Sequence, residues 1–104
     1  MKKVINHKLY NTDTAELLGE YSFGNGYSDV NYFYEALYRT KSGAYFIHGE
    51  GGARTEYATL VSSNSWTGGE NIIPISEMEA YEWAEEHDMI GVIEKYFSDQ
   101  IKEA

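Results

Sequence analysis

The sequence contains no cysteine, a single proline, and no apolar run long enough to cross a membrane. Without cysteine the 104-residue chain can form neither a disulfide framework nor a thiolate metal site, which fits the reducing cytoplasm. Lys2 and Lys3 are followed by no apolar segment, so the N-terminus does not resemble a signal peptide. We therefore expect a cytoplasmic protein that makes no membrane contact.

Basic side chains are also missing from a long stretch, because neither lysine nor arginine occurs between Arg54 and Lys95. Residues 1–54 carry equal numbers of basic and acidic side chains, so the net charge of −9 arises entirely from residues 55–104. Binding to nucleic-acid phosphates needs clustered lysine and arginine, which disfavours direct contact with DNA or RNA. The acidic field favours either a basic protein partner or a solvated surface that only aids solubility.

What the sequence does contain indicates one globular domain, residues 1–104, with an apolar fraction of 42% and ten tyrosines. Partly alternating apolar and aromatic residues predict strands at 4–11, 16–23, 32–40, 44–48 and 71–75. The first two should form a hairpin, and Pro74 restricts the last to the edge or end of a sheet. Between the strands we expect a loop at 24–29, a helical turn at 56–60 and a polar loop around Trp66 at 62–69.

Two helices are predicted at the end of the chain. Ser76 and Glu79 have the spacing of a capping box, so the first helix should begin there and run to about His87. The second helix should follow with apolar side chains at helical spacing, which are Ile90, Ile93, Phe97 and Ile101. The chain is thus predicted to be α+β, mainly β over 1–75 and helical and acidic over 76–104. Its fold would be a twisted antiparallel β-sheet of about five strands with two C-terminal α-helices.

The first predicted helix has an apolar face and an acidic face. Its apolar face, expected to pack on the sheet, holds Ala80, Trp83, Ala84 and His87. The opposite arc holds Glu79, Glu82, Glu85 and Glu86 around Met78, with Glu77 and Asp88 beside them, and Glu70 or Glu56 could extend this surface. Carboxylates three or four positions apart on a helix are about 5–6 Å from each other, comparable to the spacing of charges along a DNA strand. Like charges weaken the helix slightly without a lysine to relieve them, which favours a functional surface.

A glycine-rich motif, His48-Gly49-Glu50-Gly51-Gly52, offers a different kind of site. His48 and Glu50 share one strand face and could bind a metal or ligand, although two ligands without a third are weak evidence. A phosphate cradle needs a helix N-terminus and a lysine, which the motif does not provide. A bulge and turn at the strand end explain the glycines more simply. The histidines His7, His48 and His87 are scattered and form no catalytic grouping with serine and aspartate.

Three segments give the chain an overall pattern that is similar to known proteins. They are KLYNTDTA at 8–15, LYRTKSGAYFIHGEGG at 37–52 and GGENIIPISEMEAYEWAEEH at 68–87. The pattern resembles a family of small acidic proteins from phages, plasmids and integrative elements, which includes anti-CRISPR inhibitors, several of them DNA mimics. The resemblance implies a non-enzymatic inhibitor that acts in the cytoplasm of a bacterial host cell.

We therefore expect an anti-CRISPR-like inhibitor whose acidic, DNA-mimicking surface blocks the DNA-binding or PAM-reading site of a CRISPR-Cas effector. The expected contact residues are Glu70, Glu77, Glu79, Glu82, Glu85, Glu86 and Asp88. The partner would be a basic nucleic-acid-binding protein such as a CRISPR-Cas effector subunit, bound by a monomer or weak dimer without catalytic residue, cofactor or metal. The alternative is a small ligand- or metal-binding module, or an accessory protein of a mobile element, centred on residues 48–52.

Overall fold

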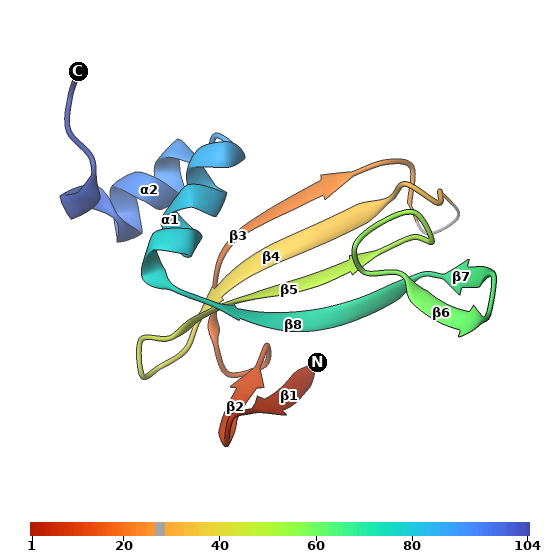
Figure 1. The fold of residues 1–104 in the computed structure, drawn as a ribbon. Helices are drawn as coiled ribbons and strands as arrows, with labels where there is room; N and C mark the ends of the chain where they lie inside the picture. The colour runs from red at the N-terminus through yellow and green to blue at the C-terminus, as the bar shows by residue number, and fades with distance from the viewer. Residues whose placement is uncertain (27–28) are drawn as a thin grey trace.

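The computed structural model describes residues 1–26 and 29–104, which form a sheet with helices on one side and a hairpin on the other (Figure 1). The strands are β1 (Lys2–Ile5), β2 (Lys8–Asn11), β3 (Glu16–Phe23), β4 (Phe33–Arg39), β5 (Tyr45–Gly51), β6 (Thr59–Ser62), β7 (Ser65–Thr67) and β8 (Gly69–Ile75). The helices are α1 (Glu77–Glu86), α2 (Ile90–Tyr96) and the short 3₁₀ helix η1 (Ser98–Gln100). Part of the predicted loop at 24–29, residues 27 and 28, lies outside the described residues.

The central layer is a twisted, four-stranded antiparallel sheet with the strand order β3-β4-β5-β8. Successive side chains of a strand point to opposite faces, so the pair Leu37 and Ile47 lies on one face and the pair Tyr38 and Phe46 on the other. β8 forms one edge, as Pro74 predicted, because an edge strand tolerates a residue without an N–H group. The predicted α+β class, with its antiparallel sheet and two helices near the end of the chain, is confirmed.

The helices cover the sheet face that carries Leu37 and Ile47 (Figure 1). The core between the layers contains Leu18, Leu37, Tyr45 and Ile47 of the sheet and Ala80, Trp83, Ala84, Ile93 and Phe97 of the helical segment. The small alanines let α1 approach the sheet closely, and each large apolar side chain buried here contributes about 1.5–3 kcal/mol. The packing face predicted for the first helix is therefore confirmed, and His87 at its end stacks on Tyr21 with ring centroids 4.0 Å apart.

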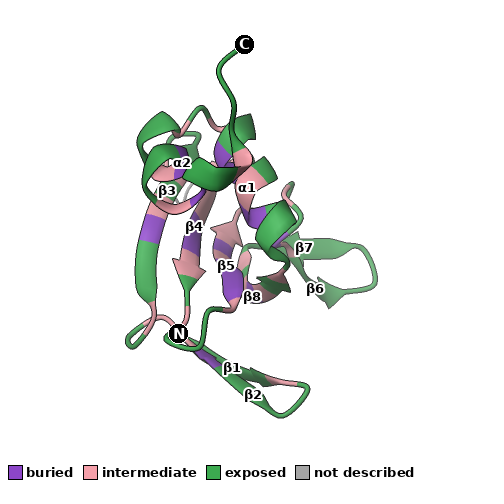
Figure 2. Ribbon diagram, turned by 90° about the vertical axis from the view of Figure 1, so that its left-hand side faces the viewer, coloured by how far each residue is buried: buried purple, intermediate pink, exposed green. Residues whose placement is uncertain are grey.

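The hairpin of β1 and β2 packs against the opposite face of the sheet, so helices and hairpin lie on different sides (Figure 2). Its buried contact is Tyr10, whose ring meets the ring of Phe46 edge-on at 5.6 Å. Phe46 in turn stacks on Tyr38 at 5.1 Å, and Ile72 of β8 completes this smaller core. The hairpin covers only part of the face, and the remainder carries polar side chains.

The prediction of one strand over 4–11 is wrong, because this segment contains the turn of the β1–β2 hairpin. Asn6 and His7 both adopt left-handed backbone conformations, with φ of 51° and 67°, which reverse the chain in two residues. The predicted hairpin between this segment and 16–23 is therefore also wrong. β3 has the predicted bounds but pairs with β4.

Three further predictions are wrong, two at the far end of the sheet and one in the second helix. Residues 56–60 form a turn that leads into β6, and residues 62–69 contain β7, so the expected helical turn and loop are replaced by the β6–β7 hairpin. The second helix ends at Tyr96 rather than near Ile101, since Ser98 and Asp99 favour local hydrogen bonds over a continued helix. In the part of the chain that the structure describes, no helix has the length and apolar character needed to cross a membrane.

Candidate functional site

Helix α1 begins at the capping box that the sequence predicts. The Ser76 hydroxyl accepts a hydrogen bond from the backbone N–H of Glu79 at 3.1 Å, and the Glu79 carboxylate accepts one from the backbone N–H of Ser76 at 3.0 Å. Hydrogen bonding of the Glu79 carboxylate to Ser76, above all to its backbone N–H, holds the pKa of Glu79 below its ordinary value. The start of the helix, and with it the direction of each side chain, is therefore set by local sequence.

The buried face of α1 is fixed by a hydrogen bond as well as by packing. The indole Nε1 of Trp83 donates to Glu35 Oε1 at 3.0 Å, and the hydroxyl of Tyr57 donates to Glu35 Oε2. Burial raises the pKa of Tyr57, and its hydrogen bond to Glu35 raises that pKa further, so the hydroxyl remains a donor. Glu35 thus joins the sheet, the helix and the segment before β6, and α1 cannot turn about its axis without losing this contact.

The acidic face of α1 is exposed along its whole length. The exposed carboxylates are Glu77, Glu79, Glu82, Glu85 and Glu86, followed by Asp88. Glu77 accepts a hydrogen bond from the side chain of Gln100 at 3.0 Å, and Glu85 accepts one from the Tyr81 hydroxyl at 2.7 Å. Six of the seven predicted contact residues are thus brought together, and we call this set the α1 acidic surface.

The α1 acidic surface is not paired with basic side chains in the described part of the chain. Among residues 1–26 and 29–104, no lysine or arginine forms an ion pair with any of its carboxylates. The last turn of α1, all of which is described, contains no basic side chain, although the negative end of the helix dipole favours one there. Glu85, Glu86 and Asp88 lie at that end instead, and Asp88 adopts a left-handed conformation with φ of 54°. The arrangement costs helix stability and produces a concentrated negative field.

The seventh predicted residue, Glu70, does not extend the α1 acidic surface. Glu70 lies at the start of β8, whereas α1 follows the end of β8 at Ile75. The length of strand between Glu70 and Ile75 is about 16 Å. Side chains point to alternate faces along a strand, so the Glu70 side chain lies on the same sheet face as that of Ile72 and on the opposite face from Asn71. Helix α1 covers the other face of the sheet. Glu70 Oε2 lies within hydrogen-bond distance of His48 Nε2, at 3.0 Å. Glu56 is separate from the surface too, because it lies in the turn before β6.

The glycines of the motif at 48–52 are explained by close packing. A Cβ atom on Gly49 would lie 2.0 Å from the Tyr57 ring, and one on Gly51 would lie 2.2 Å from the Thr55 side chain. A Cβ atom on Gly52 would lie 2.6 Å from the backbone oxygen of Asp29. The glycines therefore let residues 52–58 fold back over the sheet. They do not form a cradle for phosphate.

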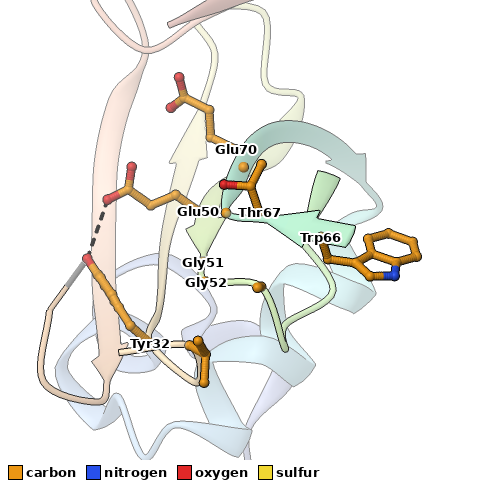
Figure 3. A pocket seen from close by; sticks show the side chains of 11 residues that line it. Tyr32, Glu50, Gly51, Gly52, Trp66, Thr67 and Glu70 are labelled. Carbon is orange, nitrogen blue, oxygen red and sulfur yellow. Dashed lines mark hydrogen bonds between the residues drawn. The ribbon is translucent and has the colours of Figure 1, made fainter. Parts of the chain in front are cut away.

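Three residues of this motif, Glu50, Gly51 and Gly52, nevertheless line a pocket of about 410 Å³ (Figure 3). Glu70, Tyr32 and Trp66 also line it, whereas His48 does not. Within residues 1–26 and 29–104 no group of three or more histidine, aspartate or glutamate side chains has the geometry of a metal site. The pocket was not apparent from the sequence, because it depends on the pairing of β5 with β8 and on the unexpected strand β7.

Glu35 was likewise missed as a structural residue. A signal existed, since Glu35 is two residues from both Phe33 and Leu37 and therefore shares their apolar face of the strand. A carboxylate in that place requires donors, which Trp83 and Tyr57 supply from 48 and 22 residues away in sequence.

Comparisons of the chain with family models, curated proteins and solved structures found no match.

Proposed function

We propose that this protein is a non-enzymatic inhibitor that occupies the DNA-binding surface of a basic protein with its α1 acidic surface. The observation that carries the proposal is the exposure of six carboxylates on and beside one helix, without an ion pair to lysine or arginine in the described residues. Burial of Ala80, Trp83 and Ala84 on the other side of α1 keeps this surface outward. Such a field attracts a cationic groove and repels nucleic acid.

The energetics of α1 support a role beyond solubility. Like charges at helical spacing cost a few tenths of a kcal/mol per pair, and acids at the C-terminal end oppose the helix dipole. A helix that needed only to stay soluble would mix lysine with glutamate on its exposed face. Residues that lower stability without a structural benefit are typical of functional surfaces.

The geometry of the carboxylates is suited to a groove that normally binds DNA. Neighbours three or four residues apart, such as Glu82 and Glu86, are about 5–6 Å from each other on a helix surface. This repeat is of the order of the spacing of charges along one DNA strand. The proposed target is a CRISPR-Cas effector in a bacterial cell, and the proposed binding surface is its PAM-reading region, where arginine side chains contact DNA.

Competition with DNA tests this proposal. The variant Glu82→Lys/Glu85→Lys/Glu86→Lys reverses the surface and leaves the capping residue Glu79 in place. The variant Asp13→Lys/Glu56→Lys/Glu94→Lys makes the same change in net charge at exposed positions outside α1. Purified CRISPR-Cas effectors would be mixed with labelled PAM-containing duplex DNA and each variant, after circular dichroism has shown that each is folded.

The wild type and the control variant should displace DNA from one effector, and the α1 variant should not. Displacement should also weaken as salt rises, because the attraction is screened over about 8–10 Å. Full displacement of DNA by the α1 variant would contradict the proposal, as would an affinity for the effector that is independent of salt.

A ligand-binding module is a second candidate, favoured by the pocket that Glu50 lines. Two carboxylates, those of Glu50 and Glu70, line this pocket, so a small cation is the ligand chemistry that this site would select. The peptide titration described below distinguishes this candidate from a protein-binding role.

A further inference from the structure

The pocket at the end of the sheet opposite to α1 brings together two carboxylates from neighbouring strands. Glu50 of β5 and Glu70 of β8 are direct partners in the antiparallel register. Side chains in this relationship have Cβ atoms about 4.5–5.5 Å apart, and two like charges so placed destabilise the pair. Neither lysine nor arginine occurs among the described residues that line the pocket. The site would therefore be stabilised by a cation brought from outside the chain.

Neighbouring donors hold the two carboxylates in position. The Tyr32 hydroxyl donates to Glu50 Oε1 at 3.4 Å, and His48 Nε2 lies 3.0 Å from Glu70 Oε2. The ring of Tyr34 meets that of His48 edge-on, and its hydroxyl donates to Glu20 at 2.7 Å, so a third carboxylate lies on the same sheet face. Burial raises the pKa of Tyr34, and the hydrogen bond to Glu20 adds to this effect. Three carboxylates, those of Glu20, Glu50 and Glu70, therefore share this part of the sheet face.

The rest of the pocket is suited to the aliphatic part of a bound side chain. The other walls include Val30, Ala53, Thr67 and the backbone of Gly51 and Gly52. In Figure 3 the carboxylates of Glu50 and Glu70 lie at one end, and the indole of Trp66 extends from the other. A side chain with a cationic head and an aliphatic stem matches this division. Arginine fits best, because its planar fork of donors can bind two carboxylates at once.

Exposed apolar residues beside the pocket indicate that the arginine belongs to a protein. Trp66 is 56% exposed, and its direct partner across the β6–β7 hairpin, Leu60, is 51% exposed. Val61 next to it is 62% exposed. Tryptophan and arginine are enriched among the residues that dominate binding energy in protein interfaces. An apolar rim next to an anionic pocket therefore provides contacts for the surface that carries the arginine.

We propose that this pocket binds the guanidinium group of an arginine side chain on the basic partner protein, with Glu50 and Glu70 as its carboxylate ligands. The proposal rests on the proposed function only in taking that partner to be a basic nucleic-acid-binding protein. Glu50 and Glu70 share the sheet face of Ile72, whereas α1 covers the opposite face, so the partner would be held at two separate points.

An NMR titration with a short peptide tests the pocket without the partner. The ¹⁵N-labelled full chain would be titrated to millimolar concentrations with acetyl-Gly-Arg-Gly-amide at physiological salt. Matched peptides would carry lysine or the neutral isostere citrulline in place of arginine. The arginine peptide should shift the Trp66 indole signal and the amides of Gly51, Gly52 and Thr67, and leave the Trp83 indole unchanged.

The carboxylates are tested by the variant Glu50→Gln/Glu70→Gln, which keeps the shape of both side chains. It should lose at least tenfold in affinity for the arginine peptide. The control Asp13→Asn/Glu94→Gln removes the same charge at exposed positions outside the pocket and the α1 acidic surface, and should bind the peptide as the wild type does. Absence of shifts at the pocket, equal shifts with citrulline or lysine, or unchanged binding by the pocket variant would each overturn the assignment.

Failure of this proposal is distinguishable from failure of the proposed function. The α1 charge-reversal variant should still bind the arginine peptide at the pocket, whatever its effect on DNA displacement. If that variant displaced DNA as the wild type does, the role of α1 would be excluded while the peptide titration still reported on Glu50 and Glu70.

Discussion

The ring of Tyr57 lies directly on the α carbon of Gly49, and its hydroxyl reaches across the strand to Glu35. Gly49 and Glu35 are partners in the register of β5 with β4, so a single tyrosine covers one residue and hydrogen-bonds the next strand. Because Glu35 also accepts from Trp83, this contact connects the glycine-rich segment with the helix that carries the acidic surface. The motif at 48–52 is thus connected to α1 through packing.

Gly49→Ala should destabilise the protein by about 1–3 kcal/mol, since the added methyl group would overlap the Tyr57 ring. Urea unfolding followed by circular dichroism measures the change. In a Tyr57→Ala background the same substitution should cost much less, because the ring is gone. An equal cost in both backgrounds would show that Tyr57 is not the cause.

Gly91→Ala is the matched control and should leave stability unchanged or raise it by up to about 1 kcal/mol. Gly91 lies in α2, and a Cβ atom there would have no neighbour within 4 Å. Destabilisation by this substitution would contradict the placement of α2.

Trp83→Ala should destabilise by about 3–5 kcal/mol, because the indole is buried and its N–H group donates to Glu35. Glu82→Gln on the adjacent exposed position should change stability little, or raise it slightly by relieving repulsion. Thermal and urea unfolding of both variants measure the difference. A small effect of Trp83→Ala would mean that α1 does not pack on the sheet through this face.

The capping box should make α1 sensitive to acid. The pKa of Glu79 is lowered in the folded protein, so its contribution to stability is present above the ordinary value of 4.5 and lost as the pH falls below it through the folded value. Glu79→Gln keeps an acceptor for the Ser76 N–H group without the charge. The stability difference between wild type and this variant should therefore shrink between neutral pH and the acid range, as measured by unfolding at a series of pH values. A constant difference would exclude the charged cap.

Salt should stabilise the free protein. The net charge of −9 and the unpaired carboxylates of α1 repel one another, and added sodium chloride screens this repulsion. The Tm should rise between low and physiological ionic strength. The variant Glu82→Lys/Glu85→Lys/Glu86→Lys should show a smaller rise, and an equal rise in both proteins would mean that α1 is not where the repulsion is concentrated.

The parts of the fold that could be predicted from the sequence are those encoded by neighbouring residues. Ser76 and Glu79 are three residues apart and define the start of α1, while Pro74 alone restricts β8 to an edge. The turn at Asn6 and His7 was missed, since the usual two-residue turn signal contains glycine. The β6–β7 hairpin was missed because its strands are exposed on both faces and have no apolar alternation to reveal them.

The two candidate sites differ in the same respect, because neighbouring residues encode one of them and strand pairing forms the other. The α1 acidic surface follows from helical periodicity and could be derived without coordinates. The pocket could not, because Glu50 and Glu70 are 20 residues apart and meet only through the register of β5 with β8. Their pairing is a property of the sheet, and no local pattern indicates it.

The exposure of the β6–β7 hairpin determines how its backbone amides exchange with solvent. Every residue of these two short strands is exposed (Figure 2), and isolated two-stranded hairpins are only marginally stable in water. Their amide hydrogens should exchange through local opening, whereas those of the central strands β4 and β5 require global unfolding. A partner that contacts Trp66 would consequently slow hydrogen exchange most strongly in the β6–β7 hairpin. That protection would identify the surface that the partner contacts without a structure of the complex.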